Sequence, residues 1–155
     1  MTTQVPQNMI VGGPAFSAYY SGASQTPSAN TYTKLIFNTE DFDTANCFDS
    51  TTNYRFTPNV AGYYQINLIS SVGQNGSATT TYTSAIYKNG VIYANACTGQ
   101  VSGGAYGNQS MSIVMYLNGT TDYIEAYIKP DTNVGFYPNN SNRSIALSGS
   151  LMRAA

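Results

Sequence analysis

The chain has 155 residues, which gives room for one domain with one sizeable core. Only 8% of the residues are charged, against about 25% in typical soluble domains, and the formal net charge is −1. Phosphate-backbone binding needs clustered lysine and arginine, and the six here are scattered along the sequence, so we expect no nucleic-acid partner. No apolar run approaches the roughly 20 residues that span a bilayer, so we expect no membrane insertion.

The first residues are polar and carry no periodic pattern, so we interpret residues 1–13 as an arm or linker and residues 14–155 as the domain. This segment has no basic stretch followed by an apolar one, so we expect no secretory signal. The two cysteines, Cys47 and Cys97, are therefore expected to be reduced and to pack as small hydrophobic side chains. An oxidising compartment would allow them to pair.

From Pro14 onward the chain reads as short segments with a period of two, separated by turn residues. Residues 63–72 predict a strand with Tyr64, Ile66 and Leu68 on its core face. Residues 111–117, 122–128 and 145–151 alternate in the same way. Their expected core residues are Met111, Ile113, Met115, Leu117, Ile124, Ala126, Ile128, Ile145, Leu147, Gly149 and Leu151.

The turn residues agree with an all-β fold. Asn89-Gly90 separates two apolar segments and predicts a type I′ hairpin, and Asn118-Gly119 predicts another in the same way. Pro58, Pro130 and Pro138 fall in the gaps, where a missing N–H breaks no ladder. No segment is typical of a helix of useful length, and the eight to ten short strands predict a sandwich or jelly roll.

Residues 56–66, Phe-Thr-Pro-Asn-Val-Ala-Gly-Tyr-Tyr-Gln-Ile, resemble the signature of complement C1q-like domains. In that signature a Phe precedes a Pro-containing turn, and Gly-x-Tyr opens the central strand. Further matches follow in family order over nearly the whole chain. They are Ala15-Phe16-Ser17-Ala18, Leu35-Ile36-Phe37-Asn38 with Phe48-Asp49 and Tyr54, Tyr87-Lys88-Asn89-Gly90, Leu117 with Asp122-Tyr123-Ile124, and Leu147-Ser148-Gly149-Ser150-Leu151.

This resemblance implies a ten-stranded, two-sheet jelly roll of the C1q/TNF-like type that forms a homotrimer with binding loops at its outer surface. Three departures are visible. Residues 1–13 contain no Gly-x-y stalk, and Thr121 stands where the family has Gly before Asp122. No acidic cluster matches the family's calcium sites, so we expect no metal and no cofactor.

The sequence offers little material for catalysis, because it contains no histidine and therefore lacks the usual general base and zinc ligand. Asp41 and Asp43 are two carboxylates that share a face if their segment is extended, but we expect them in a solvated loop, where cation binding is a further alternative. We therefore expect no enzyme.

Two sets of residues are candidates for binding. The first is too apolar for a solvent face and too polar for a core, which indicates a subunit interface, the alternative being ordinary exposed aromatic side chains. The second contains tyrosines beside turn residues, whose rings stack on sugars. The interface set is Tyr63, Gln65, Val114, Tyr116 and Tyr127, and the loop set is Tyr19, Tyr20, Tyr106 and Tyr137.

The resemblance and the charge-poor composition together favour a non-enzymatic, homotrimeric bacteriophage virion surface protein. It would be a capsid decoration, a head fibre or a tail-fibre tip that binds other virion proteins or a host receptor, glycan or protein. Residues 1–13 would anchor it, and the loops at 20–33, 73–81, 98–108 and 130–143 would face outward. The alternatives are a secreted or cell-surface lectin-like module and, more weakly, a carbohydrate-active enzyme.

Overall fold

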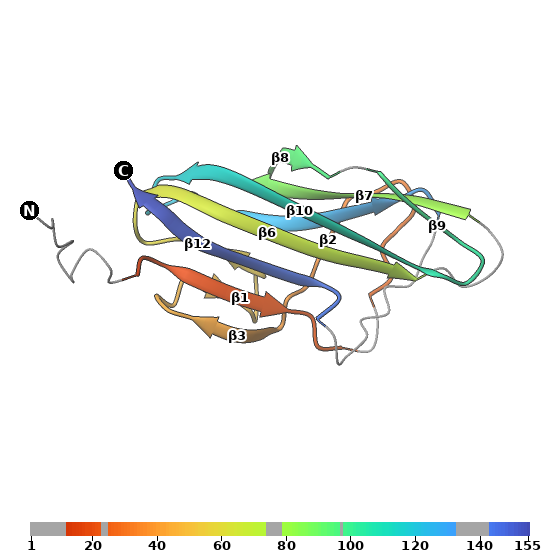
Figure 1. Ribbon diagram of the computed structural model, residues 1–155, viewed down its shortest axis with the longest axis horizontal. Helices are drawn as coiled ribbons and strands as arrows, with labels where there is room; N and C mark the ends of the chain where they lie inside the picture. The colour runs from red at the N-terminus through yellow and green to blue at the C-terminus, as the bar shows by residue number, and fades with distance from the viewer. Residues whose placement is uncertain (1–11, 23–24, 74–78, 97, 133–142) are drawn as a thin grey trace, which may run out of the picture.

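The computed structural model describes residues 12–22, 25–73, 79–96, 98–132 and 143–155, and within these ranges all regular structure is β (Figure 1). In the same ranges no helix is long and apolar enough to cross a membrane. The strands are β1 (Ala15–Tyr19), β2 (Thr33–Lys34), β3 (Thr39–Asp43), β4 (Phe48–Asp49), β5 (Arg55–Phe56), β6 (Gly62–Gly73), β7 (Thr79–Lys88), β8 (Val91–Asn95), β9 (Gly99–Ser102), β10 (Tyr106–Leu117), β11 (Ile124–Pro130) and β12 (Ala146–Ala154).

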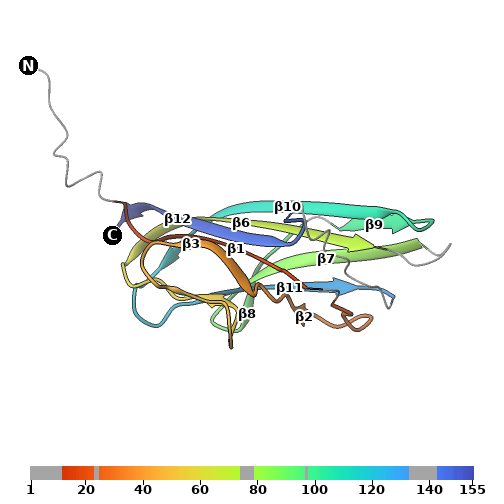
Figure 2. The same ribbon diagram turned by 90° about the horizontal axis from the view of Figure 1, so that it is seen from below.

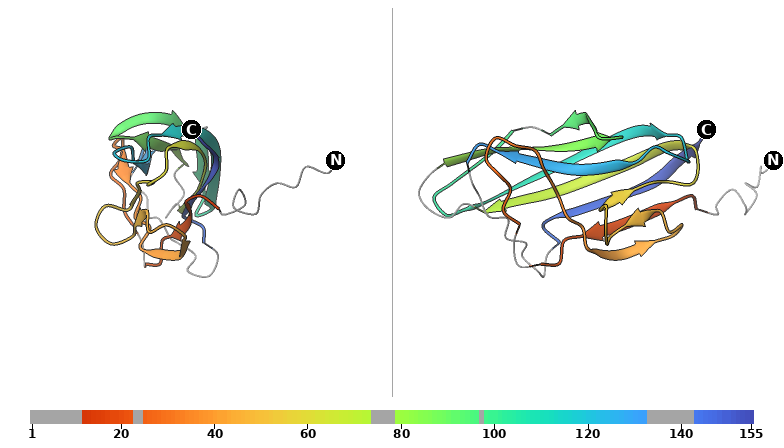
Figure 3. Two further views of the ribbon diagram at one scale, coloured as in Figure 1. Left: turned by 90° about the vertical axis from the view of Figure 1, so that its left-hand side faces the viewer. Right: turned by 180° about the vertical axis from the view of Figure 1, so that it is seen from behind.

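The strands form two antiparallel sheets that face each other (Figure 2). The first sheet has the order β10-β6-β12-β1-β3. The second has the order β4-β5-β11-β7-β8, with β2 pairing with β11 and β9 pairing with β7. The end-on view in Figure 3 shows the two sheets curving around a common interior. This arrangement confirms the two-sheet jelly roll predicted from the sequence.

The predicted inward faces are confirmed where the alternation is strongest. Tyr64, Ile66 and Leu68 of β6 are at most 1% exposed. The neighbouring Tyr63, which points to the opposite face of the strand, is 47% exposed. Met115 of β10 is buried in the same way, because it lies opposite Tyr64 in the register. Burying one face of each strand removes apolar surface from water and holds the two sheets together.

The Asn89-Gly90 turn is the hairpin that the sequence predicts, because both residues have a positive φ, 53° and 79°. The Asn118-Gly119 hairpin prediction is wrong. There β10 ends and the chain crosses to the other sheet, where β11 pairs with β7. The Asn118 side chain accepts the backbone N–H groups of Thr120 and Asp122, which closes a local turn that does not pair the flanking strands.

The start of β1 and the end of β12 lie at one end of the sandwich, called the terminal end, and the described parts of the long loops lie at the other (Figure 1). At the terminal end Gly62 at the start of β6 pairs with Ala154 near the C-terminus. The four loops predicted to face outward have their described parts at the other end, called the distal end below. There the backbone N–H of Asn30 donates to the carbonyl of Pro130 at 2.7 Å, which ties the β1–β2 connection to the end of β11.

Candidate interaction surfaces

The outer face of the first sheet brings four of the five predicted interface residues together. Val114 lies opposite Gln65 and Tyr116 opposite Tyr63 in the β10–β6 register. The rings of Tyr63 and Tyr116 meet edge to face with centroids 5.7 Å apart. Val114, Tyr63 and Tyr116 are 48%, 47% and 41% exposed, so together with Gln65 they form what we call the sheet patch.

Small, uncharged side chains continue the outer face from the sheet patch toward the distal end, whereas charges border its other parts: Arg153 lies opposite Tyr63, and Lys88 Nζ lies 5.8 Å from the Tyr116 ring centroid. Asn67 lies opposite Ser112 on one side and Ser148 on the other, and Ser148 lies opposite Ser17. The Ser112 hydroxyl donates to Asn67 Oδ1 at 2.8 Å. A second protein can therefore approach this row closely without burying an unpaired charge.

Tyr127 does not belong to the sheet patch, although the prediction grouped it there. It lies in β11 of the second sheet, where its ring stacks on Tyr87 at 4.0 Å and its hydroxyl donates to Glu125. The physical reason is the crossover after Leu117, which places the strand beginning at Ile124 in the opposite sheet.

A second apolar surface lies at the edge of the sandwich. β8 and β10 are the last strands of their sheets, and Lys88 Nζ donates to the Tyr116 carbonyl at 2.8 Å, which joins β7 to β10 at that edge. Three consecutive residues of β8 are exposed, Val91 at 68%, Ile92 at 41% and Tyr93 at 48%. We call these three the edge patch.

The loop tyrosines differ in how much of the ring is free. Tyr106, at the start of β10 on the distal end, is 64% exposed. Tyr19 has the Arg143 guanidinium 5.0 Å from its ring centroid, and Tyr20 packs against the core. Tyr137 lies outside the described residues.

The carboxylates named from the sequence are already occupied by protein groups. Asp41 accepts hydrogen bonds from Arg143 and from the Ser17 hydroxyl, and the Arg143 contact in particular lowers the pKa of Asp41. Asp43 accepts the backbone N–H groups of Ala45 and Phe48, so it caps a turn. Within the described ranges there is no group of three or more side chains suited to hold a metal ion.

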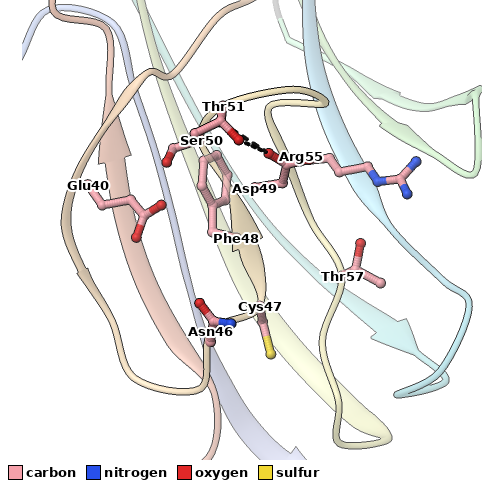
Figure 4. A pocket seen from close by; sticks show the side chains of 9 residues that line it. All are labelled: Glu40, Asn46, Cys47, Phe48, Asp49, Ser50, Thr51, Arg55 and Thr57. Atoms are coloured by element: carbon pink, nitrogen blue, oxygen red, sulfur yellow. Dashed lines mark hydrogen bonds between the residues drawn. The ribbon is translucent and has the colours of Figure 1, made fainter.

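A pocket of about 570 Å³ lies beside β4 and β5 (Figure 4). Its Asp49 accepts backbone N–H groups from Thr51 and Thr52, which hold the pKa of this carboxyl well below its usual range. Burial raises the pKa of the Cys47 thiol, and the Arg55 side chain points away from the other side chains drawn (Figure 4). The lining residues therefore supply a structural turn and an unreactive thiol. Cys97 lies outside the described residues.

One group of side chains could not be predicted from the sequence, because its members come from segments that are far apart in the chain. The outer face of the second sheet gathers three of the six cations and four tyrosines from β11, β7, the short strands β2 and β5 and residues next to them. We call it the tyrosine–cation face. Its members are Tyr32, Tyr87, Tyr123 and Tyr127 with Lys34, Arg55 and Lys129.

Solved structures with a similar fold include a complement globular domain and proteins related to tumour necrosis factor. The chain is similar to the globular domain of zebrafish complement 1qA, with 18% identity over 92% of this chain and 99% of that one and a TM-score of 0.58. It is also similar to murine APRIL, with 11% identity, 90% and 98% coverage and a TM-score of 0.57. A third similar structure is Eiger TNF from S. frugiperda, with 7% identity over 93% of this chain and 95% of that one and a TM-score of 0.59.

At these identities the similarity concerns the fold. The sequence matches no family model and none of the curated proteins. The structural matches nevertheless cover nearly the whole described chain and almost all of each matched structure.

Proposed function

Because the chain has the jelly-roll fold of the C1q/TNF-like type, we propose that it is a non-enzymatic binding domain that assembles as a homotrimer on the surface of a virion. The observation that carries the proposal is the sheet patch with the row of small, uncharged side chains beside it. Single exposed apolar side chains are ordinary, but adjacent ones that form one exposed patch are typical of an interface. Tyr63, Val114 and Tyr116 are such a group.

A ring of three identical chains needs two different surfaces that complement each other, since each chain contacts one neighbour with one patch and the next neighbour with another. The chain offers two apolar surfaces, the sheet patch on the flat face and the edge patch on β8. We therefore pair the sheet patch of one copy with the edge patch of the next.

Light scattering on the purified full chain tests the assembly, with three chain masses expected at micromolar concentration. Tyr116→Asp is expected to shift the protein toward monomer, because it buries an unpaired charge in every interface. Tyr106→Asp makes the same change at the distal end, away from both patches, and is expected to leave the trimer intact. A stable wild-type monomer, or equal loss of assembly in both variants, contradicts the proposal.

The virion location is supported by the charge-poor, Asn-, Ser-, Thr- and Tyr-rich composition and is an argument by analogy. In this setting residues 1–13 anchor the trimer, and the distal end faces outward as part of a capsid decoration, a head fibre or a tail-fibre tip. Mass spectrometry of purified particles checks the location, and immunogold labelling distinguishes head from tail. Absence of the chain from washed particles contradicts it.

The second candidate is a secreted or cell-surface lectin-like module. It is favoured by Tyr106, whose exposed ring follows the turn containing Gly103 and Gly104 and can stack on a sugar. Presence of the chain in culture fluid without particles, together with glycan-array binding, would favour this candidate over the virion protein.

A further inference from the structure

The tyrosine–cation face lies on the second sheet, on the opposite side of the sandwich from the sheet patch. Its cations come from segments far apart in the sequence. Lys34 of β2 lies opposite Tyr127 of β11, and Arg55 belongs to β5, which also pairs with β11. A trimer built through the sheet patch and the edge patch leaves the centre of this face open.

One of the three cations is neutralised within the face. Lys34 Nζ lies 2.5 Å from Glu125 Oε1 and also donates to the Asn53 carbonyl at 3.2 Å. The other Glu125 oxygen accepts the Tyr127 hydroxyl at 3.1 Å. Because the Glu125 side chain is only 7% exposed, this carboxylate serves Lys34 and Tyr127 and does not cancel the remaining cations.

The other two cations have no carboxylate partner among the described residues. Arg55 Cζ lies 4.4 Å from the ring centroid of Tyr123, and Lys129 Nζ lies 5.1 Å from that of Tyr32. A ring face beneath a cation holds it by electrostatic attraction, while its N–H groups keep their capacity to donate. Both cations are half-buried, so they are positioned before a ligand arrives.

The two unpaired cations mark opposite ends of β11. Tyr123, under Arg55, precedes Lys129 by six residues, which is about 20 Å in an extended strand. Between them lies the stacked pair Tyr87 and Tyr127, and the rings of Tyr32 and Tyr87 meet edge to face. The face therefore offers two charged anchors separated by aromatic and hydroxyl groups.

We propose that the tyrosine–cation face binds an acidic polysaccharide, a sugar chain that carries carboxylates at intervals. Widely spaced cations match sparse negative charge, and the sugar rings between carboxylates would meet tyrosine rings and hydroxyls. A nucleic-acid strand carries one charge about every 3.4 Å and would leave most of its phosphates unmatched. This assignment rests on the proposed binding function and names its ligand class.

The test is titration calorimetry of the full chain with hyaluronan oligosaccharides, which carry a carboxylate on every second sugar, with neutral dextran and single-stranded DNA as comparison ligands. Hyaluronan is expected to bind, and to bind more weakly as salt rises. Arg55→Gln and Lys129→Gln are each expected to weaken it roughly tenfold at low salt, since each removes a charge-assisted hydrogen bond. Tyr32→Leu keeps both cations but removes the ring beneath Lys129, and is expected to weaken binding less.

The matched control is Arg143→Gln, which removes one positive charge from the side chain that contacts Tyr19 and Asp41, near the first sheet. It is expected to leave hyaluronan affinity unchanged. Equal weakening by this variant, no binding of hyaluronan at millimolar concentration, equal binding of dextran, or tighter binding of DNA each overturns the assignment. Light scattering on the same samples reports trimer assembly independently, so failure of the trimer and failure of the ligand are distinguished.

Discussion

The two ends of the sandwich have different interiors. At the terminal end the space between the sheets is filled by aromatic rings, with Phe16 stacked on Phe48 and Phe56 at centroid distances of 4.9 and 4.4 Å. Toward the distal end the interior contains hydroxyls, where Ser70 Oγ lies 2.6 Å from Ser84 Oγ. Both serines are at most 1% exposed, so this end is as buried as the other, but its interior combines apolar side chains such as Tyr82 and Val72 with buried hydrogen bonds.

This difference indicates that one end mainly stabilises the fold and that the other mainly presents binding residues. Buried rings contribute stability in proportion to the apolar surface they remove from water, whereas a buried hydrogen bond contributes a smaller net amount. The aromatic end therefore contributes more of the stability of the fold. It lies beside the end of β12 and the proposed attachment point. The distal end has buried hydroxyls among its apolar side chains, and its loops can carry binding residues without being part of the main core.

The largest effect is expected from Tyr64→Ala at the terminal end. Tyr64 is fully buried, packs edge to face on Phe56, and donates its hydroxyl to the Val60 carbonyl at 2.7 Å. Removing the ring leaves a cavity and is expected to cost about 4 kcal/mol, measured by urea unfolding at fixed protein concentration.

Tyr64→Phe is the matched control, because it keeps the ring and loses the hydrogen bond. It is expected to cost about 1 kcal/mol. If both variants lose the same free energy of unfolding, the stabilisation by Tyr64 comes from its hydrogen bond and not from the buried ring. That result would contradict the assignment of ring packing to this end.

Two glycines allow the ends to be compared with one substitution. Gly119 at the terminal end and Gly103 at the distal end both have a positive φ, 72° and 65°. A Cβ on Gly119 would lie 2.3 Å from the Ala61 nitrogen, whereas one on Gly103 meets nothing within 4 Å. Gly119→Ala is expected to cost about 3 kcal/mol and Gly103→Ala about 1 kcal/mol, since only the first adds a backbone clash to the strained φ.

Thermal unfolding of the two alanine variants at equal concentration measures the difference. Equal losses would mean that the crossover at Gly119 relaxes as freely as the distal turn. The close contact between Gly119 in the β10–β11 crossover and the backbone before β6 would then contribute no more to stability than the distal turn does.

Acid sensitivity is expected at the crossover through Asp122, in addition to that from Asp41 and Asp49, whose pKa values are also lowered. Burial opposes ionisation there, but hydrogen bonds from Asn89, Lys88 and the Asn118 backbone outweigh it and lower the pKa of Asp122 below 3.8. A depressed folded pKa stabilises the protein above the unfolded value and loses this stabilisation as pH falls through the folded value.

Asp122→Asn is therefore expected to melt below wild type at pH 7, by an amount equivalent to about 2 kcal/mol. The difference in melting temperature is expected to shrink as the pH falls below about 4, near the ordinary aspartate pKa. A difference that stays constant from pH 7 to pH 2.5 contradicts this role for the carboxylate.

The strand faces could be predicted from the sequence because a period of two fixes them locally, as it does for Ile66 and Leu68. The strand with which each strand pairs could not be predicted, because an Asn-Gly pair indicates a turn but not which sheet the next strand joins. That is why Asn118-Gly119 predicts a hairpin that the structure does not form, and why the sequence groups Tyr127 with interface candidates that lie on the other sheet. The cations Lys34 and Lys129 are 95 positions apart in the sequence and share a face only after β2 pairs with β11.

The smallest effect on stability, and the sharpest test of the distal end as a display surface, is expected from Tyr106→Ala. Tyr106 is 64% exposed at the start of β10, so its truncation is expected to change the free energy of unfolding by less than about 0.5 kcal/mol. If the distal end contacts the host surface or a partner shell, the same change reduces attachment of the trimer to cells or particles in a pull-down assay, because an exposed aromatic ring contributes more contact area than its neighbours. Tyr93→Ala gives the matched comparison, since Tyr93 is also about half exposed but lies in the edge patch. It is expected to weaken assembly and to leave attachment per trimer unchanged. If Tyr106→Ala lowers the melting temperature as much as Tyr64→Ala, the distal end belongs to the stabilising core and the separation between anchor and display is wrong.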